Sequence, residues 1–253
     1  MRSTWKLIWP PLVAVIFFLA AWQVSVSLFH IEKWILPSPT DIAGEFSGNA
    51  AGIGAHTLAT LRLTMIGFPI GIAVGLIVAL LLHLIPWAKR SFYPLIILSQ
   101  NVPSIALGPL LIIWFGFGLL PKIVLITLVC FFPVAVAAMG GLAQSDRMMM
   151  NYMKMAGASK WQIFTKLELP SSLPSMFSGM KISASYAVMG AVVAEWIGAD
   201  KGIGVYMLLQ KSAYRTDRMF VAIMIIVLLS LVLFALIVLL EKWLVRWKPR
   251  RNS

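Results

Sequence analysis

Long apolar runs separated by short polar segments dominate this chain of 253 residues. The six runs are residues 7–29, 57–85, 91–119, 122–142, 182–199 and 219–240. Each is close to, or longer than, the roughly 20 apolar residues that a helix needs to cross the hydrocarbon core of a bilayer. The pattern therefore predicts an all-α, polytopic membrane protein with about six transmembrane helices, in which residues 1–253 form a single membrane domain.

Two of these runs carry unusual residues. In residues 57–85, glycines recur at positions 67, 71 and 75, a spacing that lets another helix approach closely. We expect this stripe to pack within the chain rather than form a seam between two copies. In residues 91–119, the polar pair Gln100 and Asn101 is followed by Pro103. Such a group is costly in lipid, so we expect it to face protein or a water-filled path.

Four side chains are candidates for lining such a path: Gln100, Asn101, Trp114 and Glu195. The polar pair could instead satisfy carbonyls freed by the proline, and Trp114 fits packing or the membrane interface better than stacking on a solute. Glu195 could close a gate, pair with a basic residue such as Lys201, or lie at the interface. Of these, the ion pair is preferred.

The polar stretch 145–174 lies between the fourth and fifth runs and predicts two short helices joined by a turn. Asp146 can cap a first helix that runs to about Ala156, and Gly157 stands where a left-handed stop belongs. Ser159 is followed three residues later by Gln162, which is the capping-box spacing.

The second helix of this stretch is expected to begin at Lys160 and to end before Pro170, because proline lacks a backbone donor. Trp161, Phe164 and Leu167 give it a narrow apolar face. Five methionines, at positions 148, 149, 150, 153 and 155, offer adaptable apolar contact to a protein groove. A helix resting on lipid headgroups is the alternative.

Composition and charge agree with a membrane protein, since 60% of residues are hydrophobic and only 12% are charged. The net charge of +12 reflects topology better than nucleic-acid binding, because basic residues gather in the segments between runs. Of the 21 Lys and Arg residues, seven fall on the side opposite the termini: Lys33, Arg62, Lys122, Lys201, Lys211, Arg215 and Arg218. The other 14 predict that both termini and the polar stretch lie in the cytoplasm.

Motifs for catalysis and cofactor binding are missing from the sequence. It contains no G-x-x-x-x-G-K-[ST], H-E-x-x-H or G-x-S-x-G, and Cys130 is its only cysteine. His30, His56 and His83 do not have metal-ligand spacing. We therefore expect no catalysis, cofactor or metal. A stand-alone carrier or membrane enzyme that uses Glu195 is the alternative class, although carriers driven by ion gradients usually bury several ionisable groups.

The segment 154–170, KMAGASKWQIFTKLELP, resembles the EAA loop of ABC-importer permeases, through which the permease contacts its ATPase. Gly157, Ala158, Ser159, Leu169 and Pro170 match the loop's pattern, whereas residues 151–153 (Asn, Tyr, Met) replace its Glu-Ala-Ala start. The resemblance implies that 145–174 is a cytoplasmic coupling-helix loop. Its ATPase-coupling residues would be Ala156, Gly157, Ala158, Ser159, Lys160 and Pro170.

The flanking runs resemble the nitrate, sulfonate and taurine branch of these permeases through residues 99–110 and 114–118. Within the branch, residues 99–100, 121–122, 131–133 and 195–204 are most similar to permeases for thiamine pyrimidine precursors. The resemblance implies a type I ABC importer-like permease fold in the bacterial plasma membrane. It further implies a homodimer, two cytoplasmic ATP-binding subunits and an extracytoplasmic binding protein. The solute would be a hydroxymethylpyrimidine-type precursor or, alternatively, a sulfonate, taurine or nitrate.

Overall fold

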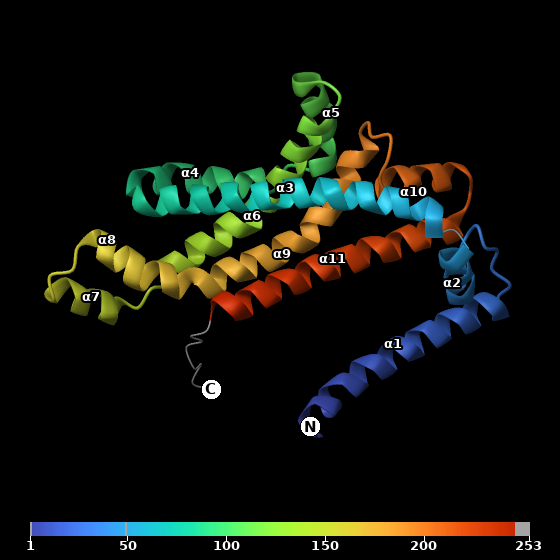
Figure 1. Ribbon diagram of the computed structural model, residues 1–253, viewed down its shortest axis with the longest axis horizontal. Helices are drawn as coiled ribbons and strands as arrows, with labels where there is room; N and C mark the ends of the chain where they lie inside the picture. Colours follow the sequence, from blue (N-terminus) through green and yellow to red (C-terminus); the bar gives the residue numbers. More distant parts are fainter. Residues whose placement is uncertain (1, 49, 246–253) are drawn as a thin grey trace.

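The computed structural model describes residues 2–48 and 50–245, and the regular elements within them are all helical (Figure 1). In chain order they are α1 (Arg2–Leu28), α2 (Pro39–Gly48), α3 (Ala50–Leu84), α4 (Pro86–Ser99), α5 (Ser104–Phe115), α6 (Leu119–Ala143), α7 (Arg147–Met155), α8 (Lys160–Ile163), the π-helical turn η1 (Phe164–Glu168), α9 (Leu169–Trp196), α10 (Ile203–Ser212) and α11 (Thr216–Leu244). The predicted all-α fold is confirmed. Residues 246–251 of the basic tail lie outside the described part.

Five helical segments are long and apolar enough to cross a membrane: Trp9–Leu28, Gly52–Leu84, Leu119–Ala143, Lys160–Trp196 and Thr216–Leu244. A sixth span exists only if α4 and α5 are counted together, and these two helices are bent by 104°. The run 91–119 is thus broken at Gln100, Asn101 and Pro103, the polar group and proline that stand out in the sequence. Pro103 lies in an extended conformation at the start of α5 (φ −60°, ψ 120°), and α5 projects away from the other helices (Figure 1).

The centre of the fold is α6, which packs between α3 and α9. The glycine stripe of α3 makes the first of these contacts possible. A Cβ atom on Gly71 would lie 2.5 Å from Cys130 Cβ, and one on Gly75 would lie 2.7 Å from the Phe131 carbonyl oxygen. Gly179 of α9 meets α6 equally closely, because its Cβ would lie 2.6 Å from Ala137 Cβ. The stripe therefore packs within the chain, as predicted.

The helix that begins at Lys160 does not end before Pro170, contrary to the prediction. It continues through η1 into α9, so that one helical segment runs from Lys160 to Trp196. In the widened turn the Leu169 N–H donates to the carbonyl of Phe164, five residues earlier. This wider turn makes room for the proline ring and needs no donor from Pro170. The expected fifth span, 182–199, is thus the second half of a longer helix.

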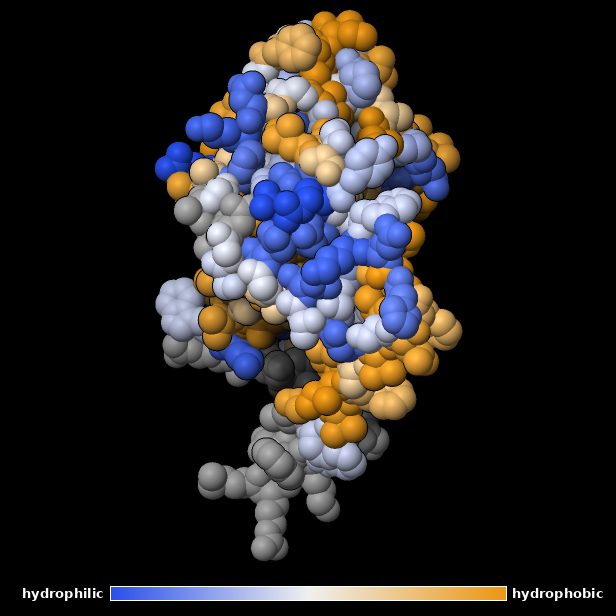
Figure 2. Space-filling model, turned by 90° about the vertical axis from the view of Figure 1, so that its right-hand side faces the viewer, coloured by the Kyte–Doolittle hydropathy of each residue, from blue (hydrophilic) through white to orange (hydrophobic). Residues whose placement is uncertain are grey.

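The two ends of the bundle carry different elements: α7 and α8 lie at one end, α2 and α10 at the other (Figure 1). At the α2 end, Glu45 accepts from Arg215 (2.6 Å) and Arg218 (3.0 Å), which joins α2 to the start of α11. Lys33 pairs with Asp41 close by. Figure 2 views this end and shows hydrophilic side chains gathered at its centre, with apolar ones around them. By contrast, α1 stands beside the bundle, and its side chains from Trp9 to Leu28 are almost all exposed.

Candidate functional site

In the bend formed by α7 and α8, local hydrogen bonds cap the first helix, α7. The carboxylate of Asp146 accepts from the backbone N–H of Met148 (2.8 Å) and of Met149 (3.3 Å), so the predicted cap is confirmed. At the other end of α7, Ala156 is the C-terminal cap, and Gly157 has φ +81°. This left-handed conformation is one that glycine adopts at little cost.

The second helix of the bend begins with the predicted capping box. The hydroxyl of Ser159 accepts from the Gln162 N–H (3.2 Å), and the Gln162 side chain accepts from the Ser159 N–H (2.8 Å). Lys160 is the first helical residue. Each helix of the bend is thus capped by its own sequence, and the turn between them has a defined shape.

The bend exposes apolar side chains. Met148 and Met155 of α7 are 81% and 80% exposed, and Tyr152 and Trp161 are 65% exposed. No residue of α7 is buried. The predicted apolar face of the second helix differs in detail, because Trp161 points outward while Phe164 is buried. A cluster of exposed large apolar groups on a capped, polar bend is typical of a surface that contacts a partner.

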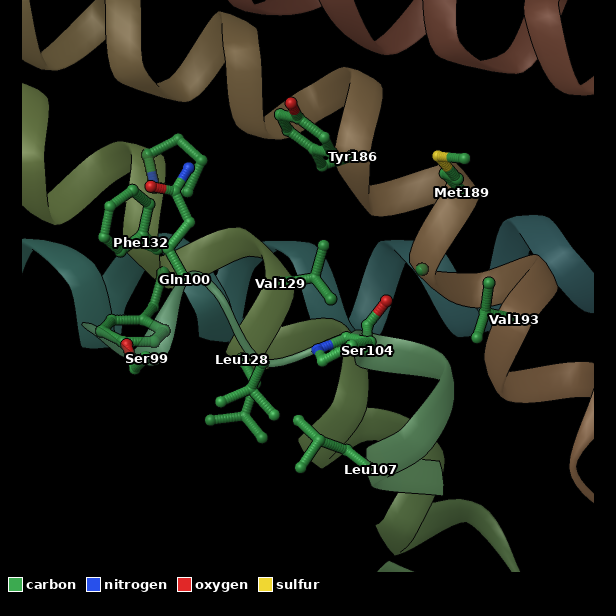
Figure 3. Close-up of a pocket in the computed structure, with 15 residues that line it drawn as sticks. Ser99, Gln100, Ser104, Leu107, Leu128, Val129, Phe132, Tyr186, Met189 and Val193 are labelled. Carbon is green, nitrogen blue, oxygen red and sulfur yellow. The ribbon is translucent and has the colours of Figure 1, made fainter. Parts of the chain in front are cut away.

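A separate cavity of about 570 Å³ lies where α4 breaks from α5, against α6 and α9 (Figure 3). Its lining is mostly apolar and aromatic. The residues are Ser99, Gln100, Val102, Pro103, Ser104, Leu107, Leu128, Val129, Phe131, Phe132, Pro133, Tyr186, Met189, Gly190 and Val193. Polar groups come from the two serines, Gln100 and the Tyr186 hydroxyl, and no lining residue is charged. Few polar groups on an apolar wall are typical of a small-molecule site.

The four candidate path residues separate in space. Gln100 lines the cavity. Asn101 is exposed beside it, and its side-chain amide donates to the Ile97 carbonyl (3.4 Å), which is the backbone-satisfying role left open above. Trp114 lies near the far end of α5 and is exposed. Glu195 is buried outside the cavity.

Glu195 has hydrogen-bond donors around it rather than the preferred basic partner. Only 2% of it is exposed, and its two oxygens accept from the Thr60 hydroxyl (2.7 Å) and from the Gly204 N–H (2.7 Å). No ion pair within the described residues involves Glu195. The expected pairing with Lys201 is therefore wrong. A carboxylate next to the first turn of a helix is stabilised by the free N–H groups there.

Sequence reasoning missed three partners: Thr60, His56 and His83. Thr60 and His56 approach the start of α10 across more than 140 positions of sequence. His83 pairs with Glu168 in η1 (2.9 Å). The available signal was weak, namely polar side chains near the two ends of an apolar run, without any indication of what each would contact.

Comparison with known proteins finds similar membrane transport proteins. Residues 71–246 match the family model described as the inner membrane component of binding-protein-dependent transport systems. A riboflavin transport system permease of Chloroflexus aurantiacus is 33% identical over 253 aligned residues, covering 98% of this chain and 94% of that protein. A formylaminopyrimidine transport permease of Halalkalibacterium halodurans is 31% identical (95% and 96%). A putative aliphatic sulfonates permease of Bacillus subtilis is 30% identical (93% and 85%).

Solved structures show the same fold. A chain of the MetNI methionine ABC transporter, in inward-facing conformations, superposes with a TM-score of 0.58 at 21% identity, covering 76% of this chain and 93% of that one. A chain of an amino acid ABC transporter gives a TM-score of 0.61 at 17% identity (81% and 97%).

Proposed function

The chain belongs to the family of inner membrane components of binding-protein-dependent transport systems, and from this premise we propose how it assembles and what it carries. It is a multi-pass permease subunit of an ABC importer. Two copies would form the path across the bacterial plasma membrane, with two cytoplasmic ATP-binding subunits and one extracytoplasmic binding protein. ATP hydrolysis would belong to the partner subunits, since this sequence contains no phosphate-binding loop.

The bend at 145–174 is the proposed contact with the ATP-binding subunits. The observation that carries this assignment is its combination of defined shape, exposed apolar groups and direct continuity with a membrane helix. A partner that changes shape on binding nucleotide can transmit force only to a segment that resists deformation. Residues 156–160 and Pro170 would serve this contact, Gly157 by fixing the turn, and Ser159 and Lys160 by starting the second helix.

The orientation that we propose places the bend and both termini in the cytoplasm. The excess of Lys and Arg on that side, 14 of 21, supports it. The α2 and α10 end would then face outward and receive the binding protein. Its charged groups are largely paired with one another, as in the contacts of Glu45 with Arg215 and Arg218.

The cavity supports an uncharged ring-shaped solute of the hydroxymethylpyrimidine type. Phe131, Phe132 and Tyr186 line it, and aromatic walls suit flat heteroaromatic rings. Gln100 offers an amide whose NH2 group can donate to ring nitrogens and whose oxygen can accept from a hydroxyl. A sulfonate, taurine or nitrate would bring a negative charge into a cavity whose lining contains no basic side chain. Burying such a charge without a partner is costly.

Uptake into proteoliposomes tests both parts of the proposal. The complete importer, with its binding protein outside and ATP inside, should accumulate labelled hydroxymethylpyrimidine and not taurine. Accumulation should continue when an ionophore collapses ion gradients. Gln100→Leu should raise the KM for uptake while the ATP-binding subunits still co-purify. Loss of uptake on gradient collapse with ATP present would favour a stand-alone carrier, and preferential uptake of taurine would contradict the ring solute.

A further inference from the structure

Helices α3 and α9 run antiparallel and are joined near both ends by side-chain hydrogen bonds. Near the bend, His83 of α3 donates from Nε2 to Glu168 Oε2 of η1 (2.9 Å). We call this contact the inner clasp. The two side chains are only 17% and 15% exposed. The His83 ring also lies against Phe164, with ring centroids 6.1 Å apart. The inner clasp thus joins the end of α3 to the turn that follows the bend.

At the opposite end, Thr60 of α3 donates to Glu195 of α9 (2.7 Å), a contact that we call the outer clasp. Thr60 is fully buried. From Thr60 to His83 the helical rise is about 35 Å at 1.5 Å per residue. That length slightly exceeds the hydrocarbon core of a bilayer, about 30 Å. The clasps are therefore far enough apart to lie near opposite borders of a membrane.

The outer clasp also holds the start of α10. Three consecutive backbone N–H groups there donate to side chains of other helices: Gly202 to His56 Nδ1 (3.1 Å), Ile203 to the Thr60 hydroxyl (2.8 Å) and Gly204 to Glu195 Oε2 (2.7 Å). A Cβ atom on Gly202 would lie 2.1 Å from the Glu195 carboxyl carbon. Side chains of α3 and α9 thus cap the first turn of α10 and fix its position.

Between the clasps, α3 and α9 are both pressed against α6 at glycines whose added Cβ atoms would overlap it. Interfaces packed this closely do not deform gradually. Sliding α3 past α9 requires at least one clasp to open. Opening the outer clasp leaves a carboxylate oxygen and a backbone N–H buried without hydrogen-bond partners, which is unfavourable.

We propose that the two clasps make α3 and α9 move as one lever, so that α10 at the outer face follows displacement of the bend. This inference rests on the proposed role of the bend as the ATPase contact. His83, Glu168, Thr60 and Glu195 are positioning residues in this scheme. They carry the motion between the two membrane surfaces and do not touch the solute.

The test compares substitutions that remove a clasp with conservative ones that keep it, in the complete importer. His83→Leu and Thr60→Val remove the donors, while His83→Gln and Thr60→Ser retain one. The readout is stimulation of ATP hydrolysis by the loaded binding protein, with basal hydrolysis measured alongside. Each removal should lower stimulation about tenfold and leave basal hydrolysis and co-purification unchanged. Each conservative variant should restore stimulation.

The double variant His83→Leu/Thr60→Val decides whether the clasps act together. If the clasps form one lever, the fold-loss of ATPase stimulation in the double variant should be smaller than the product of the fold-losses in the two single variants. The reason is that removing one clasp already uncouples α3 from α9. Losses that multiply, or single variants that stay fully stimulated, overturn the proposal. If Thr60→Val does not assemble, ATPase stimulation in His83→Leu compared with His83→Gln still tests the proposal. Failure of the wild-type chain to co-purify with ATP-binding subunits would instead refute the proposed function.

Discussion

Replacing Gly157 isolates the backbone geometry of the bend from its contacts. Its φ of +81° lies in the left-handed region, and a Cβ atom added there would meet nothing within 4 Å. The cost of a substitution therefore comes from the backbone alone. An L-residue pays about 1–2 kcal/mol in this conformation. That penalty corresponds to a roughly 5- to 30-fold lower population of the bent geometry.

This backbone cost predicts how strongly each substitution of Gly157 weakens binding of the ATP-binding subunits. Gly157→Asn should be nearly normal, because asparagine tolerates the left-handed region. Gly157→Ala should weaken binding of the ATP-binding subunits about fivefold or more, and the β-branched Gly157→Val should weaken it further. The assay titrates ATP-binding subunits onto the detergent-solubilised permease, followed by ATP-driven uptake in proteoliposomes. Membrane insertion should be unaffected.

Gly140 supplies the matched control. It lies inside α6, without a left-handed φ, and an added Cβ would also meet nothing within 4 Å. Gly140→Ala should therefore leave subunit binding unchanged. The reasoning would be refuted if Gly157→Val bound as tightly as the wild type, or if Gly157→Asn were as impaired as Gly157→Val.

Two further predictions concern packing and acid sensitivity. Gly71→Ala should lower the melting temperature of the permease, because the new methyl would lie 2.5 Å from Cys130 Cβ and overpacking costs about 1–3 kcal/mol. Gly54→Ala in the same helix has open space around it and should leave the melting temperature unchanged. Equal melting temperatures for the two variants would contradict the packing. The ammonium of Lys33 and the hydroxyl of Ser38 hold the pKa of the Asp41 carboxyl below its ordinary value of 3.8. This contribution to stability is present above about pH 4 and is lost as pH falls through the lowered pKa. Asp41→Asn should therefore melt below the wild type at pH 7, with a difference that closes in stronger acid; a difference unchanged at pH 3 would argue against the ion pair.

The local features of the bend could be predicted because their causes lie within a few residues. An Asp cap contacts the residues two and three positions on, and the capping box joins Ser159 to Gln162. Gly157 marks its own turn, because few other residues adopt that backbone freely. Most apolar runs likewise coincide with a membrane-crossing helix along nearly their whole length.

Partners that are distant in the chain could not be predicted in the same way. The sequence favoured an ion pair for Glu195, and its role as a hydrogen-bond acceptor for another helix follows only from the approach of Thr60 and Gly204. The stop expected at Pro170 failed for a related reason. Proline disfavours a helix but does not always end it, as Pro133 inside α6 shows, and nothing in the sequence reports the five-residue π-helical segment before Pro170.

That π-helical turn also determines how the bend is aimed. One residue of an α-helix corresponds to about 100° of rotation, and a π-turn absorbs one residue more than an α-turn over the same rise. Removing a single residue from 164–168 would restore ordinary helix and swing the methionine-bearing surface about a quarter of a revolution around the axis of α9. The extra residue therefore works as an angular spacer, which would set the direction in which the bend faces the proposed ATP-binding subunit.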